Sequence, residues 1–393
     1  METTMTPQYL DTDAAFTAAL ESLHDAPVVA IDTEFMREKT YYAKLCLLQI
    51  ASEQGVLLVD TLRIQDCQPL AALLANTHVM KVFHAGGQDL EILYQACGAV
   101  ASPYFDTQDA AELIGYSAQV GYGALVAGEL GVDLPKADSF TDWARRPLTP
   151  AQLSYAADDV TYLLQLYPLL SEKLTRAGRL DWLREPFAAK TDPAVLDPDP
   201  SDAYLKVRRI SQLKGVHLAV ARELALWREE EARRRDLPRR WVLGDEGLIE
   251  VAKRMPKTTE ALSGIRGVDM RGRFNKGALL AAVQAGRDLP PEDWPVLKSR
   301  KRPRQDVSAA VDLMTALVRQ RAHEAEVAPT LLANHSQLEN FALNPDDESS
   351  PLLQGWRREL IGAELLQLLR GNLVLSLDDD RLKIDNVEKS TER

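Results

Sequence analysis

Two carboxylates stand one residue apart at the end of an apolar run. Val28 to Ile31 has the composition of a buried strand, and Asp32, Thr33 and Glu34 follow it directly. Side chains two apart on a strand point to one face, so we expect the two acids to lie side by side. Two desolvated anions repel each other, and a divalent cation would keep both ionised. The alternative for this segment alone is an ordinary strand end that runs into a polar loop.

A third acid follows a predicted strand over residues 80–84. The strand ends at His84, a paired-glycine turn comes next, and Asp89 then stands in or near the first turn of a predicted helix. The helix dipole favours an acid there, which gives Asp89 a structural role to weigh against a role as a metal ligand. His84 is similarly open to two interpretations, a hydrogen-bonded structural residue or a catalytic base.

A fourth acid lies on a helix expected over residues 149–164, with Thr149 as its N-cap. Tyr155 and Asp159 are four residues apart, so they share one face of the helix, and Asp158 sits at the edge of that face. The pair could form a plain hydrogen bond on a half-buried surface. The two alanines between them favour a functional site instead, because small side chains let another chain approach the helix closely.

The three segments, in this order and at this spacing, resemble the motifs of the DEDD 3′-5′ exonucleases, in the subgroup with tyrosine in the third motif. Within that group, residues 28–50 resemble ribonuclease D. The resemblance implies that Tyr155 holds the attacking water and that Asp158 fills a motif position that is not a ligand. It implies a ligand set for two divalent metal ions, Mg²⁺ or Mn²⁺, that consists of Asp32, Glu34, Asp89 and Asp159.

The implied reaction is hydrolysis of phosphodiester bonds from RNA 3′ ends, with release of nucleoside 5′-monophosphates. Two ions about 3.5–4 Å apart can stabilise both the entering and the leaving oxygen, and such hard cations prefer carboxylate ligands. A tyrosine with a pKa of about 10 is a poor base, so we expect Tyr155 mainly to orient the water. We expect Thr33, Phe35 and His84 to contact the substrate; the alternative for Phe35 is core packing.

The elements around these residues indicate an α/β domain. Strands predicted at residues 28–35, 45–50 and 56–60 form a meander, after which the pattern alternates between strand and helix. The resemblance implies a ribonuclease-H-like α/β fold with a mixed five-stranded sheet. We assign this exonuclease domain to residues 1–190.

The net charge of −12 is divided unevenly along the chain. Residues 1–200 carry 28 acidic and 13 basic side chains, whereas residues 206–304 carry 24 basic and 13 acidic ones. An acidic first half beside a basic middle suggests a metal-dependent domain next to a module that touches phosphates. The alternative is that the basic side chains of residues 206–304 only form the solvent-exposed surface of helices.

The second half of the chain reads as all-helical. A Pro- and Asp-rich linker near residues 192–202 precedes residues 206–287, which resemble the HRDC module found after ribonuclease D catalytic domains. Residues 305–376 resemble a second, more divergent HRDC-type module, and residues 377–393 form a charged tail. The chain is therefore expected to be a multidomain protein with one α/β domain followed by two all-α domains.

Composition narrows the remaining function classes. No apolar run reaches membrane-spanning length and no signal peptide is evident, so we expect a cytoplasmic protein without a membrane partner. The three cysteines form no CxxC pair, which argues against a zinc site. We expect RNA as the partner, with tRNA precursors as substrates, and no obligate protein partner. The alternatives are a 3′-5′ DNA exonuclease and a catalytically inactive nucleic-acid-binding protein.

Overall fold

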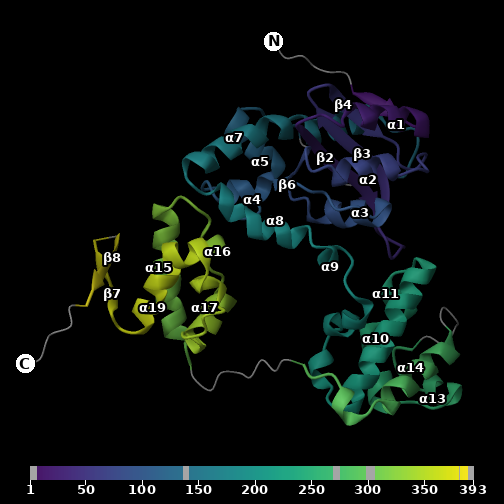
Figure 1. The fold of residues 1–393 in the computed structure, drawn as a ribbon. Coiled ribbons are helices and arrows are strands. Elements are labelled where there is room, and N and C mark those ends of the chain that lie inside the picture. Colours follow the sequence, from purple (N-terminus) through teal and green to yellow (C-terminus); the bar gives the residue numbers. More distant parts are fainter. Residues whose placement is uncertain (1–6, 136–140, 269–274, 298–305, 380, 388–393) are drawn as a thin grey trace, which may run out of the picture.

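The computed structural model describes residues 7–135, 141–268, 275–297, 306–379 and 381–387. Its first part, which we call the sheet domain, is a mixed sheet between two layers of helices (Figure 1). The strands lie in the spatial order β1-β4-β3-β2-β5-β6. Their bounds are β1 (Gln8–Leu10), β2 (Val28–Met36), β3 (Lys44–Ser52), β4 (Gly55–Val59), β5 (Met80–Phe83) and β6 (Tyr104–Asp106).

The sheet has six strands, so the expected count of five was wrong. Two strands, β1 and β6, were not among those predicted from the sequence; β1 pairs in parallel with β4 at one edge of the sheet, and β6 pairs in parallel with β5 at the other. Each has only three residues, which are too few to show a strand period. The expected meander of β2, β3 and β4 is confirmed, because both of its pairings are antiparallel.

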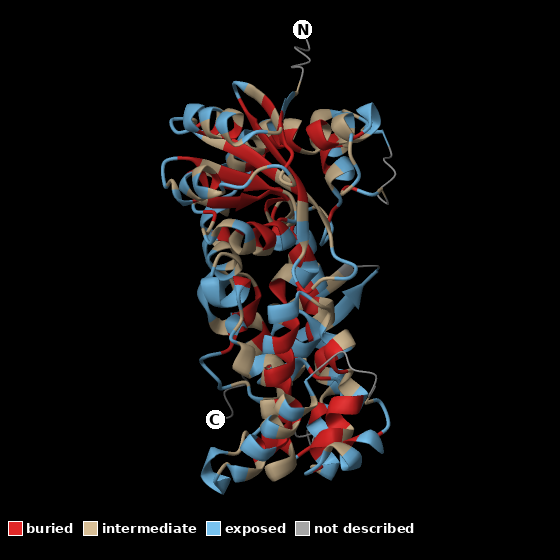
Figure 2. Cartoon of the chain, turned by 90° about the vertical axis from the view of Figure 1, so that its right-hand side faces the viewer, coloured by how far each residue is buried: buried red, intermediate tan, exposed pale blue. Residues whose placement is uncertain are grey.

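Strand β2 lies at the centre of the sheet, and its alternating side chains enter two different cores. Val29 and Ile31 pack with one set of helices, while Ala30 packs with the other set. The strands are accordingly buried in Figure 2. The first face is covered by α1 (Asp13–Ser22), α2 (Gln68–Ala75) and α3 (Gly87–Cys97). The second face is covered by α4 (Thr107–Glu112), α5 (Tyr122–Leu130), α6 (Pro150–Thr161) and α7 (Leu163–Arg176).

Two short helices, α8 (Arg184–Lys190) and α9 (Pro193–Leu196), lead from the sheet domain to a first helical unit. A Cβ on Gly286 would lie 2.5 Å from the Cα of Val220, so the glycine lets the last helix of this unit pack against its first. The unit consists of α10 (Val216–Arg235), α11 (Arg239–Val242), α12 (Asp245–Arg254), α13 (Thr259–Ser263) and α14 (Lys276–Asp288).

The second helical unit has its own hydrophobic core. It also contacts the sheet domain, where the rings of Trp182 and Trp356 stack with centroids 4.4 Å apart. Its helices are α15 (Ser308–Glu324), α16 (Pro329–Leu332), α17 (His335–Leu343), α18 (Gly355–Arg357) and α19 (Ala363–Leu369). Across all described helices of the chain, none has the length and apolar character needed to cross a membrane.

The end of the described chain is a hairpin of β7 (Leu373–Asp378) and β8 (Arg381–Asn386). We had expected a charged tail from residue 377, so the structure corrects that expectation up to residue 386. Leu375 and Ile384 pack against the core of the second helical unit. The high charge of this segment hides its alternation of apolar residues. Residues 380 and 388–393 of the expected tail lie outside the described residues.

Candidate active site

Three of the four predicted acids meet between β2 and α6. Asp32 and Glu34 stand on the face of β2 that is turned toward α6, and Asp159 projects from that helix. Each carboxylate offers an oxygen, and these oxygens all lie within 4.8 Å of one another. Three oxygen donors at this spacing can share a hard divalent cation.

The fourth acid approaches from the other face of the sheet. Alternation along β2 turns Thr33 away from α6, and its hydroxyl donates a hydrogen bond to the carboxylate of Asp89 in the first turn of α3. Asp89 does not belong to the group of three oxygens. Its negative charge nevertheless acts on that group and raises the pKa values of both Asp32 and Glu34. The two faces of one strand end thus bring four carboxylates into one electrostatic cluster.

The turn before α3 is held by a residue that sequence reasoning missed. Ala85 has a left-handed φ of 56°, and a Cβ on Gly86 would lie 2.6 Å from the Cβ of Phe83. The fully buried carboxylate of Asp106 accepts hydrogen bonds from the backbone N–H groups of both Ala85 and Gly86. The Nζ of Lys190 lies 3.1 Å from the same carboxylate. The only signal in the sequence was a single acid after a very short strand.

A second missed residue pair positions the start of α6. Arg146 binds Asp60 through two hydrogen bonds of 2.7 Å and also donates to the carbonyl of Cys46. The helix itself begins with the predicted N-cap, Thr149, which forms a capping box with Gln152. The bidentate pair ties the segment before α6 to the strands of the sheet.

Burial makes these carboxylates resist ionisation. Burial first, and then the charges of Asp159 and Asp89, together raise the pKa of Glu34 to about 8. Burial likewise raises the pKa of Asp159 to about 7 and that of Asp89 to about 6. The pKa of Asp32 lies well above its usual value, first because of burial and then because of its three acidic neighbours. An all-oxygen set of mutually repelling carboxylates fits Mg²⁺ or Mn²⁺, the ions expected from the sequence.

Tyr155 lies beside this cluster, close enough to Asp159 for the two groups to shift each other's pKa. Burial and the nearby acids raise the pKa of its phenol above the ordinary value, so the hydroxyl keeps its proton. A pocket of about 520 Å³ is lined by these two residues and by Trp143. Asp158 lines the same pocket but is not within the group of three ligand oxygens.

The three residues expected to contact substrate differ in their surroundings. The hydroxyl of Thr33 is buried and engaged with Asp89. Phe35 is half-buried, follows a β-bulge, and belongs to none of the hydrophobic clusters of the described residues. His84 has both ring nitrogens engaged, at 2.9 Å from the Thr107 hydroxyl and 3.0 Å from the Val120 carbonyl. Its geometry therefore favours the structural alternative.

Comparisons with known proteins agree with this arrangement. A family model described as a 3′-5′ exonuclease matches residues 7–175, and a model of the HRDC domain matches residues 217–283. Ribonuclease D from Gluconacetobacter diazotrophicus is 42% identical over 381 residues, which cover 96% of each chain. Ribonuclease D from Granulibacter bethesdensis is 39% identical over 373 residues, which cover 93% of each chain.

A solved structure matches nearly the whole chain. The crystal structure of Escherichia coli RNase D, an exoribonuclease involved in structured RNA processing, superposes with a TM-score of 0.80 at 32% sequence identity. The match covers 93% of this chain and 99% of that one. The similarity thus extends through the sheet domain and the helical part together.

Proposed function

Because the chain belongs to the ribonuclease D family of 3′-5′ exoribonucleases, we propose that its carboxylate cluster hydrolyses the terminal phosphodiester of structured RNAs, tRNA precursors among them. The observation that carries this proposal is the group formed by Asp32, Glu34 and Asp159, whose oxygens lie within 4.8 Å of one another. The products would be nucleoside 5′-monophosphates. We propose RNA as the only partner and the cytoplasm as the compartment in which the protein acts.

Four acids are proposed to hold two divalent metal ions, Mg²⁺ or Mn²⁺. Asp32 and Glu34 of β2, Asp159 of α6 and Asp89 of α3 would be the residues that hold them. Such ions supply a bound water of lowered pKa and stabilise charge on the entering and leaving oxygens. The contribution of the chain is to fix the carboxylates, with Thr33 orienting Asp89 and Asp106 supporting the turn that carries it.

Tyr155 is proposed to orient the attacking water. Its phenol keeps its proton because the pKa is raised, so the residue acts as a hydrogen-bonding group and not as the general base. The pocket of about 520 Å³ beside it is a suitable place for the terminal nucleotide. Phe35, partly exposed at the end of β2, is proposed to stack on a base, since such stacking tolerates any sequence.

The second helical unit is proposed to be a divergent HRDC-type domain. In the first unit a long helix, α10, is followed by the one-turn helix α11 and then by α12; in the second unit α15, α16 and α17 follow in the same order. Each one-turn helix follows or begins with a proline. We keep residues 1–190, 206–287 and 305–376 as the proposed domains, although the core of the last extends to the β7–β8 hairpin.

Matched substrates test the function. Full-length protein is incubated with RNA and DNA strands of one sequence, each labelled at the 5′ end, with Mg²⁺, Mn²⁺ or EDTA. Stepwise shortening of the RNA from its 3′ end, dependent on metal, is the expected result. Faster shortening of the DNA would favour the DNA exonuclease. Absence of cleavage with either metal would favour a binding protein without activity.

A further inference from the structure

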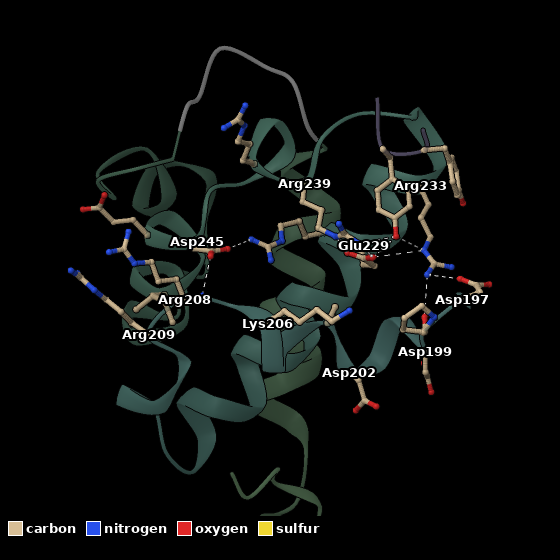
Figure 3. A pocket seen from close by; sticks show the side chains of 18 of the residues that line it. Asp197, Asp199, Asp202, Lys206, Arg208, Arg209, Glu229, Arg233, Arg239 and Asp245 are labelled. Carbon is tan, nitrogen blue, oxygen red and sulfur yellow. Dashed lines mark hydrogen bonds and ion pairs between the residues drawn. The ribbon is translucent and has the colours of Figure 1, made fainter. Parts of the chain in front are cut away.

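A cleft of about 1150 Å³ lies between the sheet domain and the first helical unit (Figure 3). One wall comes from the segment after β2, which includes Arg37, Tyr41 and Tyr42, and the other comes from residues 195–212 and helices α10 to α12. Lys and Arg side chains outnumber Asp and Glu side chains in its lining. The cleft therefore carries an excess of positive charge within an acidic protein.

Part of that positive charge is used inside the protein. The hydroxyl of Tyr41 donates to Glu229 at 2.5 Å and accepts from Arg233 at 3.0 Å and Arg239 at 2.9 Å. The guanidinium of Arg239 also binds Glu229 through two hydrogen bonds. Both arginines contact Tyr41 and so join the sheet domain to the first helical unit. Their charges are already compensated, because both lie against the carboxylate of Glu229.

Asp245, the first residue of α12, holds two segments of the helical wall of the cleft together. Its carboxylate binds Arg228 at 2.7 Å and also accepts the backbone N–H of Arg208 at 2.9 Å. The next residue, Arg209, has a left-handed φ of 67°, which costs energy for a residue with a side chain. This turn presents two consecutive arginine side chains to the cleft, and Figure 3 shows them next to each other near Asp245.

Four cations of the lining have no ion pair within the described part of the chain. The four side chains are all exposed and belong to Lys206, Arg208, Arg209 and Arg240. Phosphates are the natural partners of exposed arginines without a carboxylate. At the other end of the cleft in Figure 3 lie the acids Asp199 and Asp202, which would repel a polyanion and keep it on the arginine side.

We propose that these four cations bind backbone phosphates of the RNA segment that lies upstream of the 3′ end during trimming. The proposal rests on the exoribonuclease function. Arg37, which lines the cleft, is three residues beyond Glu34 and directly follows the end of β2, so the cleft begins close to the carboxylates. An RNA whose 3′ end lies at the carboxylates would therefore place its upstream nucleotides in the cleft.

The test compares two triple variants of the full-length protein with equal loss of charge. The first is Arg208→Ala/Arg209→Ala/Arg240→Ala. The control is Arg176→Ala/Arg184→Ala/Arg319→Ala, which removes three exposed arginines outside the cleft. Affinity for a fluorescent 20-nucleotide RNA is measured in EDTA at several salt concentrations, and hydrolysis of a tetranucleotide is measured with Mg²⁺.

We expect the cleft variant to bind the 20-nucleotide RNA at least tenfold more weakly than the control variant. The slope of log Kd against log salt should fall by about two, since each lost phosphate contact to a single strand contributes about 0.7. Tetranucleotide hydrolysis should stay within twofold of wild type. Equal affinities and equal salt slopes for the two variants would overturn the proposal. If the wild-type protein shortens neither the tetranucleotide nor the 20-nucleotide RNA with Mg²⁺ or Mn²⁺, the proposed function fails, and the binding measurements still decide the role of the cleft.

Discussion

The hydroxyl of Thr33 donates a hydrogen bond to the carboxylate of Asp89, across a sequence separation of 56 residues. It connects the centre of the sheet to the first turn of α3, on the face opposite to α6. The bond explains how one strand can gather acids from both of its faces. Thr33 is thereby expected to act on the proposed metal site through Asp89.

Thr33→Val should weaken metal use without removing a ligand. The variant keeps the β-branched shape but removes the hydroxyl that donates to the buried Asp89 carboxylate, so we expect the Mg²⁺ concentration for half-maximal activity to rise about tenfold. Thr33→Ser retains the hydroxyl and serves as the control, with a nearly unchanged Mg²⁺ requirement. An equal shift in both variants would show that the hydroxyl does not orient Asp89.

Asp159→Asn and Asp158→Asn form a matched pair of neighbouring substitutions. Asp159 belongs to the ligand group and Asp158 does not, so the first variant should lose more than about 100-fold in kcat and the second less than about fivefold. Single-turnover cleavage of a short RNA with saturating Mg²⁺ measures both. A larger loss for Asp158→Asn would mean that the ligand assignment is displaced by one residue.

Tyr155→Phe should lower kcat by about 100-fold while RNA affinity in EDTA changes less than about twofold, because only the hydroxyl that orients the water is lost. The ring still packs near Trp143, with centroids 6.1 Å apart. Tyr167→Phe in the core of the sheet domain is a suitable control and should leave kcat unchanged. Unaltered turnover of the Tyr155 variant would reject the role.

The stability of the protein in EDTA should depend on pH in a defined direction. The pKa values of Asp89, Asp159 and Glu34 are raised to about 6, 7 and 8, whereas unfolded carboxyls titrate near about 4. Between these values the folded chain binds more protons than the unfolded chain, so stability falls as pH rises from about 4 to about 8. The melting temperature should therefore drop over this window. Added Mg²⁺ should restore more of the melting temperature at pH 8 than at pH 5. A flat profile in EDTA would contradict the raised pKa values of these buried carboxylates.

Arg146→Lys should destabilise the sheet domain. Lysine keeps the charge but cannot reproduce the bidentate bond to the buried Asp60, so we expect a loss of about 1–3 kcal/mol. Arg63→Lys is the control, because Arg63 is 60% exposed and its Nε lies 3.8 Å from the same carboxylate. Its effect should stay below about 0.5 kcal/mol. Urea unfolding followed by tryptophan fluorescence compares the two, and equal midpoints would exclude an anchoring role for Arg146.

Local patterns in the sequence were sufficient for the residues that share one element. The period of two along β2 placed Asp32 and Glu34 on one face, and the i,i+4 spacing placed Tyr155 beside Asp159. The N-cap at Thr149 followed from its neighbours in the same way. These relationships depend on the geometry of a single strand or helix, which the sequence carries in full.

Only the tertiary structure decided which distant residues support the site. The hydrogen bond of Thr33 to Asp89, the cradle made by Asp106, the pairing of β1 with β4 and the insertion of Tyr41 against α10 each join segments that are far apart in the chain. No local period marks such partners, because any buried carboxylate or edge strand can be satisfied by many segments until the fold brings one of them near. The sequence by itself therefore predicted the candidate catalytic side chains and their elements, and the packing of those elements determined what holds the side chains in place.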